Sequence, residues 1–251
     1  MGNEQQDLTG KWALITGAAK RIGECIARRL HHHGTGIAIH YRQSAGPAEE
    51  LAAALNAKRP DSAIVLHADL QQTAHLSHLV KAVIDHTGRL DILVNNASSF
   101  YATPLETVTE EQWDDLVGTN LKAPLFLSQA AAPHLKQSGG VIINLIDVHS
   151  TRPLRNHPVY GPAKAGLAML TRSLAKDLAP AVRVNGVSPG AILWPDDGIT
   201  DKLEESIVKQ IPLGRTGEPD DIAGCVLYLV RDADYVTGQI IKVDGGRTIG
   251  W

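Results

Sequence analysis

Short runs of aliphatic residues alternate with longer amphipathic stretches along the whole chain. The aliphatic runs have lengths typical of buried strands, and we predict seven of them, at Trp12–Thr16, Gly36–Tyr41, Ala63–His67, Ile92–Val94, Val141–Ile146, Arg183–Val187 and Ile240–Val243. The stretches between them have helical periodicity, and we predict helices at Ile22–His33, Pro47–Lys58, Ala74–His86, Glu111–Leu135, Val159–Leu178 and Asp220–Val230. Continuous apolar strands separated by helices indicate a doubly wound parallel α/β sheet with helices on both faces.

Composition narrows the class of protein without changing this picture. Of 251 residues, 43% are hydrophobic and 20% are charged, which excludes a disordered or fibrous chain. The net charge of -3 argues against nucleic-acid binding, and no apolar run reaches the roughly 20 residues of a membrane span. Without an internal repeat or a linker, we expect residues 1–251 to form one domain. The first residues lack the pattern of a signal peptide, so we expect a cytoplasmic protein.

A glycine-containing loop joins the first predicted strand to the first helix. It runs from Thr16 to Gly23, the place where an open α/β sheet binds a pyrophosphate on a helix N-terminus. Gly17 permits a tight turn, Gly23 lets the helix pack close to the sheet, and Arg21 stands between them. The loop therefore predicts a dinucleotide site, with an ordinary connecting turn as the alternative.

The end of the second strand indicates which dinucleotide binds. NAD-binding folds usually carry an acidic residue there for the ribose hydroxyls, but residues 34–48 contain none. Arg42 offers a guanidinium group and Ser44 a hydroxyl, which suit a 2′-phosphate, and Lys20 could add a second cation. We therefore expect NADP(H) rather than NAD(H). Asp69 and Leu70 end the third strand, where a side chain can reach the adenine.

Tyr160 and Lys164 are four residues apart, so on a helix they share one face. Pro162, between them, is tolerated only in the first turn of that helix. A tyrosine with its ordinary pKa near ~10 is a poor acid–base group until a nearby cation stabilises the phenolate. This spacing is common by chance, but behind a dinucleotide loop it predicts a catalytic pair.

Together these motifs resemble the short-chain dehydrogenase/reductase superfamily. The resemblance extends from Lys11 to Gly246 and rests on Thr16–Gly23, Asn95-Asn96-Ala97, Asn120, Tyr160 with Lys164, Pro189-Gly190 and Val243–Gly246. It implies a Rossmann-like fold, hydride transfer to or from a nicotinamide cofactor, and Tyr160 as the acid–base group assisted by Lys164. It also implies that Asn120 helps to hold a proton-relay water. The implied cofactor contacts are Gly17, Lys20, Arg21, Ile22, Gly23, Tyr41, Arg42, Ser44, Asp69, Leu70, Asn95, Ala97, Ser98, Tyr160, Lys164, Pro189 and Gly190.

Two departures from the superfamily pattern sharpen the resemblance. Asp147 stands 13 residues before Tyr160, where the superfamily usually has serine. A carboxylate there opposes ionisation of the tyrosine and accepts hydrogen bonds from an amine-rich substrate. Ser98 replaces the usual glycine after Asn-Asn-Ala, and Phe100 follows. With Arg21 and the basic segment at 40–44, this combination is similar to the pteridine reductases.

That similarity implies a role for each residue of the substrate site. Phe100 would stack on a flat pterin and sandwich it against the nicotinamide. Arg21 and Ser98 would contact both the cofactor phosphate and the substrate, while Asp147 and Tyr160 would face the ring nitrogens. The simpler alternatives are that Phe100 is a core aromatic residue and that Asp147 caps a loop.

The expected activity is NADPH-dependent reduction of a pterin, either dihydrobiopterin, dihydromonapterin or dihydrofolate. One alternative is a short-chain carbonyl or 3-oxoacyl-thioester reductase, and another is a non-catalytic NADP(H)-binding sensor. Asp147 and Phe100 favour the pterin, since a simple ketone needs a serine hydroxyl and has no ring to stack.

The remaining expectations concern segments outside this constellation. Gln43 stands where eukaryotic pteridine reductases tend to have a second base, and Ile192 and Trp194 replace common hydroxyl residues. We expect residues 191–210 to form a mobile substrate loop and a helix. The histidines at 31–33, 75 and 78 lack a third ligand nearby, so no metal is expected. The family resemblance implies a homotetramer with the Glu111–Leu135 and Val159–Leu178 helices at its main interface.

Overall fold

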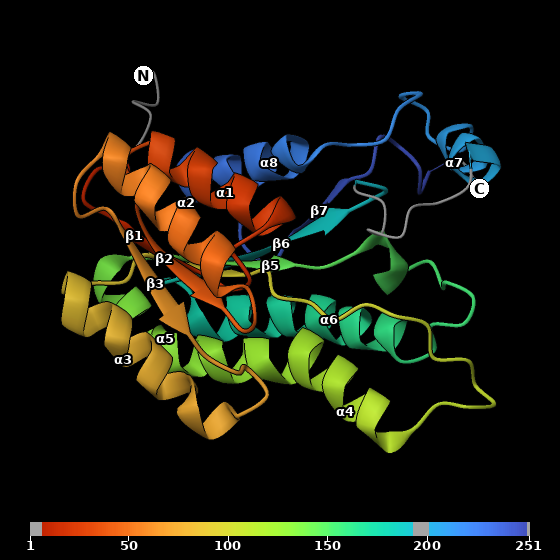
Figure 1. The fold of residues 1–251 in the computed structure, drawn as a ribbon, viewed down its shortest axis with the longest axis horizontal. Helices are drawn as coiled ribbons and strands as arrows, with labels where there is room; N and C mark the ends of the chain where they lie inside the picture. Colours follow the sequence, from red (N-terminus) through yellow and green to blue (C-terminus); the bar gives the residue numbers. More distant parts are fainter. Residues whose placement is uncertain (1–6, 193–200, 250–251) are drawn as a thin grey trace.

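A single seven-stranded parallel sheet forms the centre of the computed structural model, which describes residues 7–192 and 201–249. The strand order is β3-β2-β1-β4-β5-β6-β7 (Figure 1). The strands are β1 (Trp12–Ile15), β2 (Gly36–Tyr41), β3 (Ala63–His67), β4 (Ile92–Asn95), β5 (Val141–Leu145), β6 (Arg183–Pro189) and β7 (Ile240–Val243). The doubly wound α/β fold predicted from the aliphatic runs is therefore confirmed.

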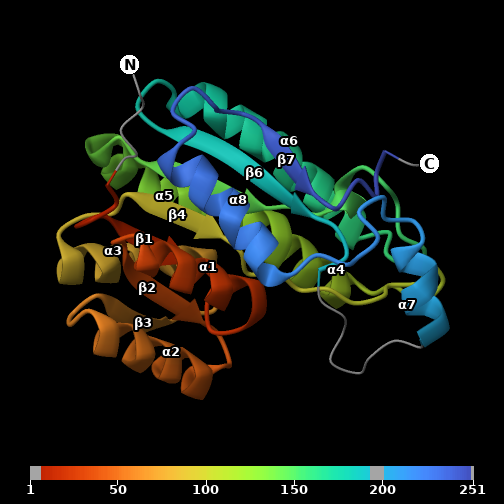
Figure 2. The same cartoon turned by 90° about the horizontal axis from the view of Figure 1, so that it is seen from above.

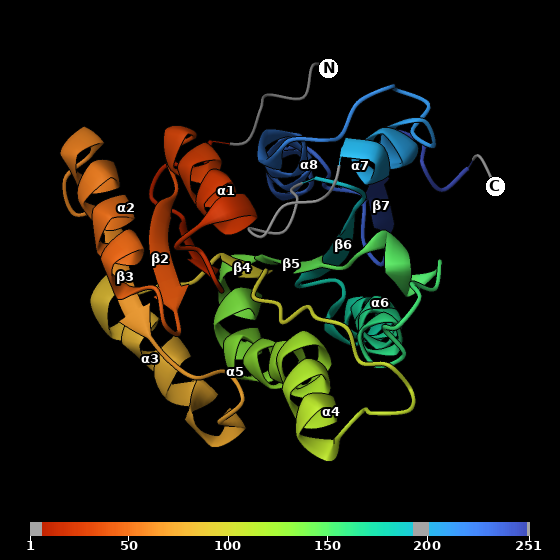
Figure 3. The ribbon, with the colours of Figure 1, turned by 45° about the vertical axis from the view of Figure 1, so that its right-hand side comes forward.

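Helices cover both faces of this sheet (Figures 1 and 3). One layer contains α1 (Arg21–His32), α2 (Ala45–Lys58) and α8 (Pro219–Arg231), and the other contains α3 (Leu76–Thr87), α5 (Ala123–Ser138) and α6 (Tyr160–Leu178). Successive side chains of a strand point to opposite faces, so Ile15 of β1 packs with the first layer and Leu14 with the second. Both residues are fully buried.

The prediction of one helix from Glu111 to Leu135 was wrong in one respect. The structure has α4 (Glu110–Val117), a π-helical segment over Gly118–Lys122, and then α5. Inside the π segment, the side-chain amide of Asn120 donates to the carbonyl of Leu116 at 2.9 Å. A side chain that takes a helical carbonyl disturbs the regular bonding ladder, and single π turns are frequent at functional sites.

The strand order reverses at β1, because β2 and β3 lie on one side of it and β4 to β7 on the other. In open α/β sheets, ligands bind beyond the carboxyl ends of the strands at such a switch point. Beyond the carboxyl ends of β6 and β7 lies α7 (Asp201–Val208), as Figure 2 shows. The helix expected within 191–210 is therefore present, while Trp194 and the rest of 193–200 lie outside the described residues.

Candidate active site

The glycine loop turns sharply between β1 and α1. Gly17 has a φ of +61°, and a Cβ added there would lie 3.1 Å from the Cα of Ala97. At Gly23 a Cβ would clash with the carbonyl oxygen of Gly17. Arg21 also has a positive φ, of 56°, although it is not a glycine. The loop is thus tightly packed, and it places the N-terminus of α1 just beyond the carboxyl end of β1, where a pyrophosphate site is expected.

Hydrogen bonds tie the end of β1 to the end of β4 beneath this loop. The Asn96 side-chain amide donates to the carbonyls of Thr16 at 2.8 Å and Gly17 at 3.0 Å. In return, the Thr16 hydroxyl oxygen accepts from the backbone amides of Asn96 and Ala97, both at 2.9 Å. Asn96 and Thr16 therefore set the position of the glycine loop relative to β4.

His40 supports the same loop from β2, a role that the sequence did not indicate. Its Nδ1 lies 3.1 Å from the backbone nitrogen of Gly17, and its Nε2 lies 3.1 Å from the carbonyl oxygen of Ala68. Because the Gly17 amide can only donate, Nδ1 accepts and the ring proton is on Nε2. Burial lowers the pKa of His40 to about 4. His40 is thus a neutral support, and its assignment to a basic segment was wrong.

At the carboxyl end of β2, Arg42 is 44% exposed and lies beside a carboxylate. Its Nη1 is 4.0 Å from Oδ1 of Asp115, a residue of α4. Ser44 is the N-cap residue of α2, but its side chain makes no capping hydrogen bond. Asp69, after β3, accepts a hydrogen bond from the backbone nitrogen of Gln71 at 3.1 Å. Arg42 and Ser44 therefore form a polar rim on the part of the cavity expected to hold the adenosine.

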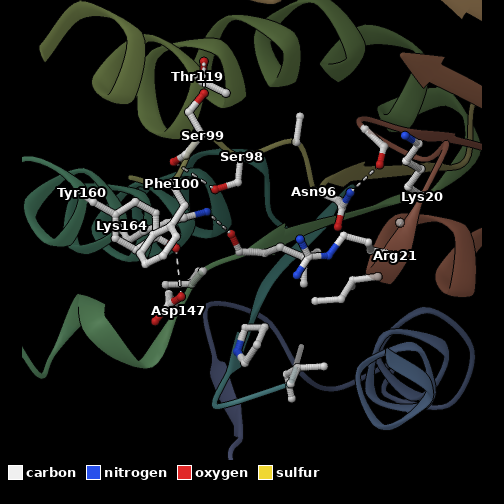
Figure 4. Close-up of a pocket in the computed structure, with 18 of the residues that line it drawn as sticks. Lys20, Arg21, Asn96, Ser98, Ser99, Phe100, Thr119, Asp147, Tyr160 and Lys164 are labelled. Atoms are coloured by element: carbon white, nitrogen blue, oxygen red, sulfur yellow. Dashed lines mark hydrogen bonds between the residues drawn. The ribbon is translucent and has the colours of Figure 1, made fainter. Parts of the chain in front are cut away.

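Tyr160 is the first residue of α6, and its buried phenol reaches back toward the end of β5. The Tyr160 hydroxyl donates to Oδ2 of Asp147 at 2.9 Å (Figure 4). Asp147 also caps the following turn, because its Oδ1 accepts from the backbone nitrogen of His149 at 2.8 Å. Burial and the adjacent Asp147 carboxylate raise the pKa of Tyr160 well above its ordinary value. The phenol is therefore held protonated.

Lys164 lies one helical turn after Tyr160 and is fully buried. Its Nζ donates to the carbonyl of Leu145 at 2.9 Å and lies 5.8 Å from the centre of the Tyr160 ring. Burial lowers the pKa of Lys164 to about 8, with Asp147 acting in the opposite direction. The predicted shared face of the two residues is confirmed, and Pro162 lies in the first turn of α6.

Phe100 is 51% exposed, so it is not a core aromatic residue. One of its contacts is the ring of Tyr160, in a T-shaped pair with ring centres 4.8 Å apart and planes inclined by 75°. It also stacks on His157 at 4.9 Å and 15°. The neighbouring Ser98 hydroxyl donates to Oδ1 of Asn120 at 2.6 Å. The loop after β4 thus presents an aromatic ring beside Tyr160.

A cavity of about 670 Å³ brings these groups together, within the usual size range of small-molecule sites. Figure 4 shows Lys20 and Arg21 toward one side of it, and Phe100, Tyr160 and Asp147 toward the other. The expected site residues that line it are Gly17, Lys20, Arg21, Ile22, Gly23, Tyr41, Arg42, Ser44, Asp69, Leu70, Ala97, Ser98, Phe100, Asp147, Tyr160, Lys164, Pro189 and Gly190.

Two expected site residues, Asn95 and Asn120, lie behind the cavity wall. The Asn95 side-chain amide donates to Oδ1 of Asn144 on β5 at 2.8 Å. Asn120 is buried and holds the loop after β4, because its amide also donates to the carbonyl of Ser99 at 2.9 Å. Sequence reasoning missed other lining residues, among them His40, Asn96, Ser99, Thr119, His149, Leu154 and Arg247. The sequence could have identified Asn96, because it lies next to Asn95 in the Asn95-Asn96-Ala97 motif.

Among residues 7–192 and 201–249, no three histidine, cysteine, aspartate or glutamate side chains are grouped to hold a metal ion. Over the same residues, no helix is long and apolar enough to cross a membrane.

Comparison with known proteins gives matches over almost the whole chain. A family model described as "Enoyl-(Acyl carrier protein) reductase" matches residues 17–248. Pteridine reductase 1 of Leishmania tarentolae is 39% identical, over 96% of this chain and 97% of that protein. The 3-oxoacyl-[acyl-carrier-protein] reductase FabG of Staphylococcus aureus strain N315 is also 39% identical, over 94% and 97%.

A solved structure with a closely similar fold also matches almost the whole chain. A crystal structure of a Sinorhizobium meliloti 1021 protein assigned as a short-chain alcohol dehydrogenase superposes with a TM-score of 0.92. It is 33% identical and the match covers 98% of this chain and 99% of that one. The solved relative thus shares the fold of this chain, and the matched proteins differ in their named substrates.

Proposed function

Because the chain belongs to the short-chain dehydrogenase/reductase family, we propose that this oxidoreductase uses NADPH to reduce a pterin-type substrate. The observation that carries the proposal is the 2.9 Å hydrogen bond from Tyr160 to Asp147 beside the half-exposed ring of Phe100. An acid held protonated next to a carboxylate and an aromatic face suits a flat, amine-rich ring. Dihydrobiopterin, dihydromonapterin and dihydrofolate all have such a ring.

The cavity residues fit a dinucleotide with a 2′-phosphate. The glycine loop directs backbone amides of α1 toward a pyrophosphate, with Lys20 and Arg21 beside it. Arg42 and Ser44 are the groups available to a 2′-phosphate, and Asp69 and Leu70 line the part of the wall assigned to the adenine. When bound, the cofactor supplies the hydride; the protein supplies the proton and the orientation.

Proton donation is assigned to Tyr160. Its pKa is raised by burial and by Asp147, so at neutral pH the hydroxyl carries the proton that a ring nitrogen needs. Lys164 lies behind the ring with its charge fixed by the carbonyl of Leu145, and it stabilises the phenolate left after the proton transfer. Asp147 accepts hydrogen bonds from the amino groups of the substrate.

Substrate orientation is assigned to Phe100, Arg21 and Ser98. The exposed part of Phe100 offers a face for stacking at the side of the cavity that holds Tyr160. Arg21 enters the cavity from the start of α1 (Figure 4), and the Ser98 hydroxyl is held in place by Asn120. These positions favour a planar heterocycle over a flexible acyl chain.

A second candidate is reduction of a 3-oxoacyl thioester. It is favoured by the equal 39% identity to FabG and by the description of the matching family model. Asp147 argues against it, because it replaces the serine whose hydroxyl would polarise a ketone oxygen alongside Tyr160, and a carboxylate accepts hydrogen bonds instead.

The test is oxidation of NADPH with dihydrobiopterin, dihydromonapterin, dihydrofolate and a 3-oxoacyl thioester in parallel. We expect turnover with at least one pterin or folate and none above background with the thioester. Tyr160→Phe is the control that links turnover to this cavity. Turnover of the thioester alone would overturn the proposal.

We further propose that the protein is a homotetramer. Exposed apolar side chains lie on the helices expected at the interface: Leu125 and Phe126 on α5, and Met169 on α6. Such groups are typical of surfaces that are buried by association. Light scattering after size exclusion should give four times 26.9 kDa, and Phe126→Glu should lower that mass. A monomeric wild type would contradict this proposal.

A further inference from the structure

Asp115 of α4 connects separate parts of the cavity wall, although no sequence pattern distinguished it. Its Oδ1 accepts from the Gln71 side-chain amide at 2.5 Å and from the Ser99 hydroxyl at 3.4 Å. Its Oδ2 accepts from the Tyr101 hydroxyl at 2.9 Å. The Arg42 guanidinium lies 4.0 Å from Oδ1. One carboxylate therefore contacts segments that follow β2, β3 and β4.

Two of these contacts lie on either side of Phe100 in the chain. Ser99 precedes it and Tyr101 follows it, so one carboxylate holds both neighbours of the proposed stacking ring. The Tyr101 hydroxyl stays a donor at all working pH values, because burial and the hydrogen bond to Asp115 raise its pKa to about 12. Together with Asn120, which binds the Ser99 carbonyl, Asp115 therefore holds the backbone of this loop and with it the Phe100 ring.

The fourth contact of Asp115 is with Arg42, the residue proposed to bind the 2′-phosphate of the cofactor. Arg42 and Asp115 are 44% and 27% exposed in their side chains, and a pair 4.0 Å apart in contact with solvent is weak. A phosphate dianion is a stronger partner for a guanidinium, so it can take Arg42 from Asp115. The same dianion and the Asp115 carboxylate repel each other.

We propose that Asp115 is a positioning residue that couples the 2′-phosphate site at Arg42 to the placement of Phe100. The proposal rests on the proposed function, since it assigns the 2′-phosphate to Arg42 and the pterin to Phe100. A cofactor with the phosphate releases Asp115 from Arg42, and the carboxylate then bonds more strongly to Tyr101 and Ser99. A cofactor without the phosphate leaves the Asp115 carboxylate shared between Arg42 and its hydrogen-bond partners Tyr101 and Ser99.

The test uses two variants and a matched control. Asp115→Ala removes the carboxylate, Tyr101→Phe removes only the bond at Oδ2, and Asp114→Ala removes the adjacent, exposed carboxylate of the same helix. Dissociation constants for NADPH and NADH are measured without substrate, and kcat and KM are measured with dihydrobiopterin.

The expected effects have opposite signs, which a loss of folding would not produce. In Asp115→Ala the Kd for NADPH falls about threefold because a repelling charge is gone. The Kd for NADH stays within about twofold, and the KM for dihydrobiopterin rises about fivefold or more because Phe100 loses its support. Tyr101→Phe raises KM about threefold and leaves both dissociation constants unchanged. Asp114→Ala leaves every constant within about twofold.

Several results would overturn the proposal. Weaker binding of both cofactors by Asp115→Ala would mean a general structural role, and an unchanged KM in both variants would remove the link to Phe100. If Asp115→Ala does not fold, the KM of Tyr101→Phe for dihydrobiopterin alone tests the proposal. If wild type turns over no pterin, the proposed function fails, and an unchanged Kd for NADPH in Asp115→Ala then rejects the coupling independently.

Discussion

Replacing Asp147 by asparagine tests the feature that separates this site from the common superfamily pattern. Asp147 accepts two hydrogen bonds, from the Tyr160 hydroxyl at 2.9 Å and from the His149 backbone nitrogen at 2.8 Å. Asparagine offers one carbonyl oxygen and one amino group in the same space. Because the His149 N–H needs an acceptor, we expect the oxygen to face His149 and the amino group to face Tyr160.

The expected loss follows from that geometry. The substrate amines lose a hydrogen bond to a charged group, which is worth about 1.5–3 kcal/mol. A loss of that size lowers kcat/KM for the pterin roughly 10- to 150-fold. The removal of the carboxylate also takes away one cause of the raised pKa of Tyr160, so the alkaline loss of activity moves to lower pH than in the wild type.

The assay is kcat/KM for dihydrobiopterin with saturating NADPH across the pH range in which the protein is folded. Asp114→Asn is the matched control, since it neutralises an exposed carboxylate outside the cavity. Asp147→Ser provides the usual superfamily residue and should lose the pterin activity. A pterin kcat/KM within about threefold of wild type, with an unmoved alkaline limb, would refute the role of Asp147.

Three further predictions follow from other parts of the site. Tyr160→Phe removes the proton donor, so kcat should fall at least 100-fold while the Kd for NADPH changes less than threefold; near-normal kcat would exclude Tyr160 as the acid. Arg42→Gln should raise the Kd for NADPH about tenfold or more and leave that for NADH unchanged; equal effects on both would remove Arg42 from the 2′-phosphate site. The pKa of His40 is about 4, against an ordinary 6.5. The unfolded state therefore binds more protons between these values, and the free energy of unfolding should fall by roughly 3 kcal/mol on acidification through that window. Urea titrations at several pH values check this; His40→Gln should have a shallower slope, and equal slopes would contradict the assignment.

Local sequence signals were sufficient for the parts of the site that depend on neighbours in the chain. Aliphatic runs predicted the strands, and the loop from Thr16 to Gly23 was found because a strand and a helix flank it. Tyr160 and Lys164 were paired correctly because a helix places residues four apart on one face, and α6 begins at Tyr160.

Contacts between distant segments could not be predicted in this way. The helix expected over Glu111–Leu135 contains a π segment because the side chain of Asn120 takes a backbone carbonyl, and hydrophobic periodicity does not record such competition. His40 was grouped with basic residues, although burial under the glycine loop makes it neutral. Its charge depends on desolvation, which is a property of the packed structure.

The sequence by itself determined the α/β class, through the alternation of aliphatic runs and amphipathic stretches along the chain. It also identified the glycine loop, the pairing of Tyr160 with Lys164 and the unusual Asp147, because each of these depends on residues close together in the chain. Only the tertiary structure decided which groups meet at the carboxyl ends of the sheet. It placed Asp147 against Tyr160, and it made Asp115 a shared partner of Arg42 and Tyr101. Those contacts join residues brought together by the crossovers between parallel strands, so their distances exist only once the sheet has formed.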